Sequence, residues 1–392
     1  MISDPLKDRM KAWRRDLHQY PELGFKEHRT SAVVAELLRE FGLEVHTDIG
    51  GTGVVGVLQR GNSTRAIGLR ADMDALPIQE KNRFSHRSAT DGVMHACGHD
   101  GHTAMLLGAA HQLANSRRFS GRAVFIFQPA EEHGSGAPAM LADGLFERFP
   151  VDEVYGLHNM PGLPVGHFAL RPGPIMASEA LFEIIVQGQG GHAAMPHRGA
   201  DALIVAAEIV TSLQTIVSRK LDPGRNGVVS VTDLHTDGQR NILPGRAVLT
   251  GDARALSKDV NLQIEHQMRQ IVGGICAAHG VTGSVEYETV FDVLVNAEEA
   301  TAKAAEAAGS VWEFFAGSGQ VDKSCAPILA SEDFAHLAAA RPGCFVFAGN
   351  GTQGAHAQAL HSADYDFNDD LLGPGAAFWV RLVEQELPVV EA

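Results

Sequence analysis

Cysteine is scarce in this sequence. Only four of its 392 residues are cysteines, and they lie far apart along the chain: Cys97, Cys276, Cys325 and Cys344. Their spacing matches no zinc finger, and such usage is typical of a reducing compartment, where thiols stay unpaired. We therefore expect a cytoplasmic protein.

Positive charge and long apolar runs are scarce as well. Lys and Arg number 32 against 47 Asp and Glu, a formal net charge of −15, which disfavours nucleic acid and anionic membrane surfaces. No run approaches the roughly 18 apolar residues that span a bilayer. The polar start "MISDPLKDRMKAWRRDLHQY" lacks the apolar core of a signal peptide. We expect neither nucleic acid nor a membrane among its partners.

The length and the 45% hydrophobic content predict a sizeable core, divided between two domains. In the first part of the chain, helical patterns alternate with short apolar runs: helices over 27–42 and 102–113, strands over 53–58, 65–71 and 122–128. Short apolar strands between helices indicate an α/β fold, with a central mixed sheet flanked by helices.

The middle of the chain has a different order of predicted helices and strands. Two long helices are predicted over 200–220 and 258–279, and strands over 181–189, 227–235, 247–256 and 283–295. The order β-α-β-β-α-β is that of a ferredoxin-like unit, which folds as a compact α+β domain. We therefore predict an inserted domain over 178–293, and a catalytic domain formed by 1–177 and 294–392.

Residues 94–103, "MHACGHDGHT", concentrate donors that bind metals. Three histidines, a cysteine and an aspartate fall between His95 and His102. A structural cysteine usually lies in an apolar run, and surface histidines are usually scattered. The density of donors therefore indicates a metal-binding loop.

Further ligands are expected at the ends of strands, where a sheet brings loops together. "FIFQPAEEHGSG" ends an apolar strand and then offers Glu131 and Glu132 side by side; "VYGLHNMPG" contains His158, and "ALHSADYDF" contains His361. Adjacent carboxylates after a buried strand repel each other unless a cation lies between them or one stays protonated. In a hydrolase one carboxylate binds metal while the other takes a proton from the attacking water. A solvated turn is the alternative.

These stretches together resemble a known family. "MHACGHDGHTAMLL", "FQPAEE", "GLHN", "GGHAAMPH" and "LHSADYDF", with "LHQYPELGFKEHRTS" and "LRADMDALPIQE", resemble blocks of the hippurate hydrolase and N-acyl-amino-acid amidohydrolase group. This group belongs to the di-metal aminoacylase/carboxypeptidase family. The blocks stand in family order over about 17–367. Plant auxin-conjugate hydrolases share them, so the substrate does not follow from them.

The resemblance implies roles for particular residues. Five match the family's metal ligands: Cys97, His99, Glu132, His158 and His361. Glu131 matches its general acid/base. The resemblance implies two divalent ions per subunit, and imidazole, carboxylate and thiolate suit Zn, Mn, Ni or Co. Whether Cys97 bridges the two ions stays open.

One stretch departs from the wider family. Carboxypeptidase relatives have a histidine ligand two residues before the aspartate of their first block, and here Asp72 stands in that place. We expect Asp72 and Asp74 to orient the ligands, with a helix N-cap or a turn as the alternative. Two roles remain open for His95, Asp100 and His102: they could orient the ligands, or they could stabilise the loop.

The inserted domain carries its own signals. In "QGQGGHAAMPH", His192 matches a family histidine that lies near the active site and polarises the scissile carbonyl; the alternative is an exposed hinge histidine. "QRNILPGRAVLTGDAR" resembles the family's Asn-x-Ile-Pro block, which makes Asn241 and Arg254 candidates for holding the substrate carboxylate. The commoner form continues Gly-Thr-x-Arg, whereas here Asp252 precedes Arg254 by two residues.

The sequence thus predicts a metal-dependent amidohydrolase that cleaves the amide bond of N-acyl or N-aroyl amino acids. The inserted domain would act as a lid or dimerisation module, and we expect a small-molecule substrate and a homodimer or homotetramer. A metallo-dipeptidase or carboxypeptidase of the same fold is one alternative. A non-enzymatic metal-binding protein is another, although storage needs no acid/base such as Glu131. A serine hydrolase is disfavoured because no Gly-x-Ser-x-Gly motif occurs.

Overall fold

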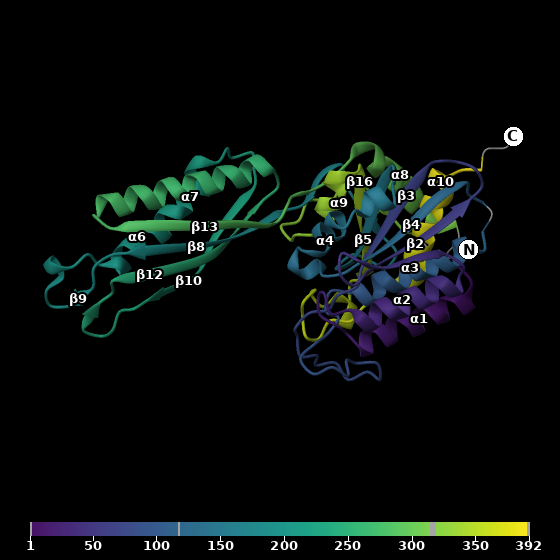
Figure 1. The fold of residues 1–392 in the computed structure, drawn as a ribbon, viewed down its shortest axis with the longest axis horizontal. Helices are drawn as coiled ribbons and strands as arrows, with labels where there is room; N and C mark the ends of the chain where they lie inside the picture. Colours follow the sequence, from purple (N-terminus) through teal and green to yellow (C-terminus); the bar gives the residue numbers. More distant parts are fainter. Residues whose placement is uncertain (1, 117, 314–318, 390–392) are drawn as a thin grey trace. The chain divides into compact units, whose positions relative to one another are not determined.

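The computed structural model describes residues 2–116, 118–313 and 319–389. The chain forms two compact units (Figure 1). The first unit combines Met1–Ile175, Val295–Ala326 and Glu332–Ala392, and the second combines Met176–Leu294 and Pro327–Ser331.

An eight-stranded mixed sheet forms the centre of the first unit. Its strands in spatial order are β1 (Glu44–Ile49), β2 (Gly53–Arg60), β4 (Gly121–Gln128), β3 (Ala66–Asp72), β5 (Glu153–Pro161), β16 (Gly343–Gly351), β6 (Phe168–Ala169) and β15 (Val321–Asp322). The four central strands β4, β3, β5 and β16 pair in parallel, and β1, β2 and β6 add antiparallel pairings. β3 is buried along its whole length, as expected for a central parallel strand. The predicted central mixed sheet is confirmed.

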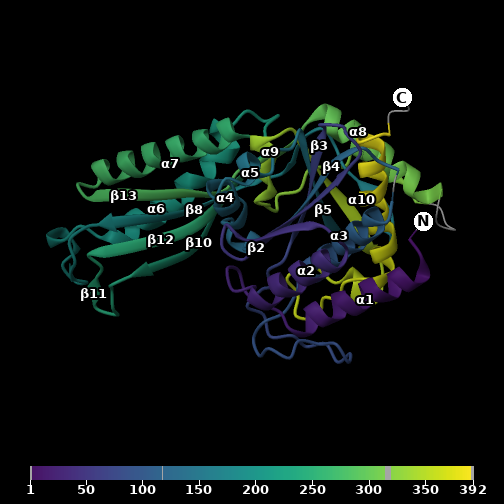
Figure 2. The same cartoon turned by 45° about the vertical axis from the view of Figure 1, so that its right-hand side comes forward.

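Helices cover both faces of this sheet (Figures 1 and 2). One layer contains α1 (Asp4–Gln19), α2 (His28–Glu40), α3 (His99–Ala114), α8 (Glu298–Ser310) and α10 (Leu372–Glu386). The other contains α4 (Gly136–Ala142), α5 (Leu145–Arg148) and α9 (Phe334–Ala340). Successive strand residues point to opposite faces, so Leu69 and Phe125 pack in the core under α3, whereas Phe345 meets Phe334 of α9.

Helix α3 is the buried centre of its layer and carries part of the donor-rich loop. It is apolar or small on almost every side, and nearly all of its residues are buried. Gly108 allows α1 to approach, because a Cβ there would lie 2.0 Å from Met10 Sδ. The helix begins at His99, three residues earlier than predicted, because Gly98 at φ 95° turns the chain directly into it. His99 and His102 therefore lie on a helix.

The second unit is an antiparallel four-stranded sheet with two helices. Along the chain its elements are β8 (Ser178–Gln187), α6 (Ala202–Thr215), β10 (Gly227–Thr236), β12 (Arg246–Ala255), α7 (Lys258–Ala278) and β13 (Thr282–Phe291). The spatial order β10-β12-β8-β13 is the ferredoxin-like one, which confirms the predicted fold. Its core lies between the sheet and the two helices.

The ends of the second unit differ slightly from the predicted 178–293. It also takes in residues 327–331, because Ala177 N–H donates to Ala330 O at 3.0 Å and Met176 forms a β-bridge with Ile328. A short sheet of β7 (Gly173–Met176) and β14 (Leu294–Asn296) lies where the chain enters and leaves the unit. The 327–331 segment could not be assigned to this unit from the sequence, because it has no periodicity of its own.

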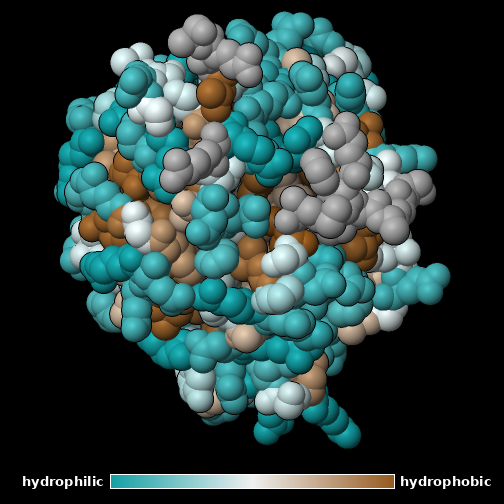
Figure 3. All heavy atoms as spheres, turned by 90° about the vertical axis from the view of Figure 1, so that its right-hand side faces the viewer, coloured by the Kyte–Doolittle hydropathy of each residue, from teal (hydrophilic) through white to brown (hydrophobic). Residues whose placement is uncertain are grey.

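One helix in the described part of the chain, Ala202–Lys220, is by length and composition apolar enough to cross a membrane. It consists of α6 and the π-helical turn η3 (Ile216–Lys220). Its side chains Val205, Ile209 and Leu213 pack in the core of the second unit, whereas Leu203, Ile204 and Val217 are exposed. Figure 3 shows one face of the molecule, where hydrophilic side chains predominate and hydrophobic ones are interspersed.

Candidate metal centre

The carboxyl ends of the central parallel strands bring the predicted donors together. β3 ends at Asp72, β4 is followed by Pro129 and the paired glutamates, and His158 lies near the end of β5. Neighbouring parallel strands end at the same edge of a sheet, which is where sites form in open α/β folds. His361 follows β16, the fourth strand of this parallel set. The sequence could predict the meeting of Asp72, His158 and the paired glutamates, because each of them follows or ends an apolar run.

The five predicted ligands form one continuous cluster. Cys97, His99 and His158 offer donor atoms that all lie within 4.8 Å of one another, and so do Cys97, Glu132 and His361. Cys97 Sγ lies 3.3 Å from His158 Nε2. Glu132 lies between two imidazoles, with Oε1 3.8 Å from His99 Nε2 and Oε2 3.5 Å from His361 Nε2. Cys97 and Glu132 therefore stand where two neighbouring groups of ligands meet.

The protonation of the two buried histidines follows from their neighbours. His99 Nδ1 lies 2.9 Å from the carbonyl oxygen of Asp74, and His158 Nδ1 lies 2.7 Å from that of Asn159. A carbonyl oxygen only accepts, so Nδ1 is the donor in both rings, which leaves Nε2 as the atom that can bind a cation once it carries no proton. Both Nε2 atoms face the cluster. This is the arrangement of a metal-ligating histidine held by a backbone carbonyl.

The cluster fits divalent metal ions. His99 Nε2 and Glu132 Oε1 are buried and have no hydrogen-bond partner among the described residues, although they face each other. A buried polar atom left without a partner is costly. Coordination to a cation would satisfy both atoms, and the set of imidazole, thiolate and carboxylate is the one that zinc-like ions take.

The electrostatics of the cluster also favour the binding of a cation. Burial, followed by the charges of Glu132 and Glu131, raises the pKa of the Cys97 thiol well above its usual value. Burial raises the pKa of Glu132 to about 7, against the opposing effect of His99. Burial and the neighbouring Glu332 and Glu132 raise the pKa of Glu131 well above its ordinary range. Divalent cations favour the deprotonated thiol and carboxylates, and so reverse these effects.

Asp72 and Asp74 are buried against the cluster and contact its histidines. Asp74 accepts from His99 Nδ1 and, through Oδ2, from the Glu132 N–H at 3.1 Å. Asp72 lies 2.6 Å from His102 Nδ1. Neither carboxylate is at a helix N-cap, which was one of the two alternatives beside a turn.

The residues that the sequence left open also have defined neighbours. His102 Nε2 accepts from the Asn159 N–H at 3.0 Å, so His102 bridges Asp72 to the strand that carries His158. Asp100 points away from the ligands and binds His18 Nδ1 at 2.9 Å. His95 is buried, and neither ring nitrogen has a hydrogen-bond partner.

A buried ion-pair network beside Glu131 was not predicted from the sequence. Arg70, in the middle of β3, donates to Asp72 at 2.7 Å, to Glu332 at 2.8 Å and to Asp333 at 3.0 Å. The Asp333 N–H in turn contacts Glu131 Oε1 at 3.4 Å. Arg70 keeps its charge, because the three carboxylates outweigh the effect of burial and raise its pKa. An arginine inside an otherwise apolar strand was the one available signal.

The backbone is strained at two points of the cluster. Four non-glycine residues in the described chain have positive φ, and two of them are Ala130 (φ 49°) and His361 (φ 63°). Ala130 immediately precedes the paired glutamates. Such strain persists only where surrounding contacts hold it, and it is concentrated at functional sites.

The three remaining predicted residues belong to the second unit. His192 ends β9 (Gly191–His192) and Asn241 directly precedes β11 (Ile242–Leu243), the strand that pairs with β9; the Ala193 N–H donates to Asn241 O at 3.0 Å. Arg254 is already paired, with Glu179 at 2.8 Å and Asp252 at 2.9 Å. The contact of all three with a substrate stays a prediction.

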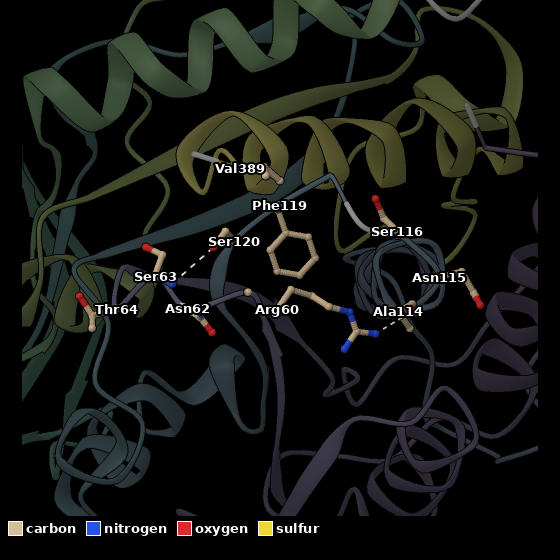
Figure 4. Close-up of a pocket in the computed structure, with 11 residues that line it drawn as sticks. Arg60, Asn62, Ser63, Thr64, Ala114, Asn115, Ser116, Phe119, Ser120 and Val389 are labelled. Atoms are coloured by element: carbon tan, nitrogen blue, oxygen red, sulfur yellow. Dashed lines mark hydrogen bonds between the residues drawn. The ribbon is translucent and has the colours of Figure 1, made fainter. Parts of the chain in front are cut away.

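A separate cavity of about 1150 Å³ in the first unit is unrelated to this cluster. Ser63, Ser116 and Ser120 are among its lining residues, and none of the predicted site residues is. Figure 4 shows Arg60 beside it, with the guanidinium directed to the Ala114 carbonyl oxygen at 2.6 Å. Among the described lining residues Arg60 is the one cation, and it is thus engaged by the protein itself.

A Cys/His/Glu ligand set at the carboxyl edge of a mixed sheet, with a second buried glutamate beside it, defines a metal-dependent hydrolase. The chain belongs to peptidase family M20/M25/M40, whose model matches residues 68–385. The family resemblance inferred from the sequence blocks is confirmed.

Individual relatives match three quarters of the chain or more. It is 41% identical over 369 residues to the hippurate hydrolase of Campylobacter jejuni, covering 94% of each chain. It is also 41% identical over 301 residues to the N-acyl-L-amino acid amidohydrolase of Geobacillus stearothermophilus, covering 76% of this chain and 80% of that one. A dinuclear metal binding peptidase of Bacillus subtilis has a similar crystal structure, with a TM-score of 0.85, 31% identity and coverage of 98% and 99%.

Proposed function

We propose that the protein is a metal-dependent amidohydrolase that cleaves the amide bond of N-acyl or N-aroyl amino acids, releasing a carboxylic acid and a free amino acid. The observation that carries the proposal is the position of Glu131. It is a buried carboxylate next to Glu132 and lies outside the two donor groups that share Cys97, although its carboxylate also comes within reach of His99. The names of the relatives in Campylobacter and Geobacillus support an acyl-amino-acid substrate.

The residues that would hold two divalent ions are Cys97, His99, Glu132, His158 and His361. Bound there, the ions would polarise the scissile carbonyl and make the attacking water more acidic. Asp74 would fix the His99 ring and the Glu132 main chain, and Asp72 would fix His102, through the contacts already described. The native metal is not determined by this ligand set.

In this proposal Glu131 moves the proton. Its carboxylate takes a proton from the attacking water and later gives it to the nitrogen of the leaving amine. The Asp333 N–H contact to Oε1 leaves Oε2 available for this transfer. His192 would stabilise the oxyanion of the tetrahedral intermediate, and Asn241 would hold the substrate carboxylate. Arg254 could join Asn241 only by exchanging one of its two carboxylate partners.

Location and assembly belong to the same proposal. Cys97, Cys276, Cys325 and Cys344 are all free thiols, which supports a reducing, cytoplasmic environment. A homodimer or homotetramer remains the expected assembly.

A carboxypeptidase activity is the second candidate, because the chain is 39% identical over 370 residues to thermostable carboxypeptidase 1 of Saccharolobus solfataricus, covering 93% of this chain and 91% of that one. The two activities differ in the group on the substrate nitrogen. Turnover of benzoylglycine and acetylated amino acids should be compared with that of dipeptides that have a free amine, each with and without a chelator.

We expect chelator-sensitive hydrolysis of the acylated substrates in preference to the dipeptides. Preference for dipeptides would favour the second candidate. Hydrolysis that persists after complete removal of metal would contradict both. Metal analysis of protein purified without added metal identifies the native ion in the same preparation.

A further inference from the structure

The strained turn at Ala130 aims the two glutamates at the metal centre. Ala130, with φ 49° and ψ 42°, lies between the end of β4 and the short helix η1 (Glu131–His133). An L-alanine is unfavourable in this left-handed conformation, which glycine adopts without strain. A change in the Ala130 torsions would move Glu131 and Glu132 together, because both follow it directly.

A carboxylate from a distant part of the chain holds this turn. Glu27 Oε1 accepts the Ala130 N–H at 2.9 Å, across 103 residues of sequence, and Glu27 Oε2 accepts from the Thr52 hydroxyl. The Glu27 side chain is completely buried. The Glu27 backbone begins α2, with the Ser31 N–H donating to Glu27 O at 2.8 Å, so its side chain projects from a fixed point.

Glu27 is a costly group to bury for a structural purpose alone. No Lys, Arg or His forms an ion pair with it among the described residues, and a buried carboxylate without a cation is unfavourable. Both of its oxygens instead accept from neutral donors at the base of the site. The residue is in "PELGFKEHRTS", a stretch to which no role in the site had been given.

We propose that Glu27 is a positioning residue, which stabilises the strained Ala130 turn and thereby aims Glu131 and Glu132. The expected effect of a Glu27 substitution on turnover rests on the proposed function, whereas its expected effect on metal retention does not. Asp74 holds the same turn from its other side, through the Glu132 N–H. Glu27 and Asp74 thus fix the main chain on both sides of Glu131.

The test replaces the acceptor and then removes the strain. Glu27→Met fills similar space without an acceptor, Glu27→Gln keeps one, and Ala130→Gly makes the left-handed turn favourable without help. The matched control is Glu22→Ala. Glu22 belongs to the same stretch and accepts the Arg29 N–H at 3.0 Å and the Thr30 N–H at 2.8 Å, but it does not contact the turn. Ala130→Val, which strains the turn with Glu27 in place, is a second route should Glu27→Met fail to fold.

Three quantities are measured for each variant: the metal retained against a competing chelator, kcat and KM for benzoylglycine in excess metal, and the midpoint of thermal unfolding. For Glu27→Met we expect kcat to fall by about 10²-fold, the scale of a misplaced reacting group, with weaker metal retention and little change in KM. Glu27→Gln should recover most of this loss. Adding Ala130→Gly to Glu27→Met should restore kcat by about fivefold or more, as removal of the left-handed strain allows.

The proposal is overturned if Glu27→Met and Glu22→Ala match in kcat and metal retention, since Glu27 would then serve folding only. It is also overturned if Ala130→Gly restores neither quantity in the Glu27→Met protein. Should the wild-type protein hydrolyse no acyl-amino acid, the proposed function fails, whereas the comparison of metal retention still decides the role of Glu27.

Discussion

The residues predicted to carry the chemistry lie in two regions of opposite physical character. In the first unit Cys97, His99 and His158 are buried, and their donor atoms converge. In the second unit His192 is exposed, and Arg254 is paired with two carboxylates. Buried donor atoms that converge without a protein partner, as His99 Nε2 and Glu132 Oε1 do, indicate a metal site, because their burial is otherwise costly. An exposed histidine gives no such indication, and only experiment assigns its role.

The largest effect is expected from the buried region. Glu131→Gln removes the proton-carrying carboxylate while keeping its size, so turnover should fall by about 10²-fold or more. Metal content should stay near that of the wild-type protein, because Glu132 and not Glu131 belongs to the ligand groups around Cys97. Measuring kcat beside metal stoichiometry checks both statements. Wild-type turnover in the fully metallated variant would remove Glu131 from the mechanism.

The exposed region is tested by His192→Ala. If His192 stabilises the oxyanion, kcat should fall by about 10²-fold, as for the loss of one oxyanion donor. Folding and metal content should be unchanged, because the side chain is exposed and lies outside the ligand cluster. Should kcat stay unaltered, His192 is the exposed hinge histidine of the alternative interpretation. The chemistry would then belong to the first unit alone.

A smaller effect on turnover is expected from Cys97→Ser once metal is supplied. A serine hydroxyl is protonated at neutral pH and binds these ions poorly, so the variant should lose metal to a chelator more readily than the wild-type protein. Excess Mn or Zn should restore part of the activity. Dialysis against chelator followed by metal analysis gives the answer. Full stoichiometric retention of metal would make Cys97 a structural residue.

The smallest effect concerns Arg254. Asp252 competes for its guanidinium, at 2.9 Å, in a partly exposed pair. If Arg254 also holds the substrate carboxylate, Asp252→Asn should lower KM for benzoylglycine by about two- to fivefold, the scale of an exposed ion pair. The control is the hydrolysis of a benzoyl amide that has no carboxylate. Its KM should not change. A KM for benzoylglycine equal to that of wild type would leave Arg254 with its internal contacts only.

Sequence patterns predicted the parts of the site that follow strands. Glu131, Glu132 and His158 could be placed because an apolar run locates the strand, and the strand end locates the loop. Arg70 and Glu332 could not, because an ion pair joining residues 262 positions apart leaves no local pattern. Glu27 was hidden for the same reason, since its contact with Ala130 becomes visible only when β4 and α2 are in place. The periodicity of a sequence predicts helices and strands. It does not predict which single side chains, far apart in the sequence, contact each other.

The ligand set is spread along the chain, from Cys97 to His361, and this has a consequence for biosynthesis. The ribosome makes Cys97 and His99 first, then the entire second unit, and only afterwards β16 and His361. At usual translation rates of about 5 to 20 residues per second, the early ligands wait roughly 10 to 50 s for the last one. The complete set of five predicted ligands is thus available only after His361 has been made, when nearly the whole chain has been synthesised. A site that needs all five residues would therefore bind its metals at the end of synthesis or after it.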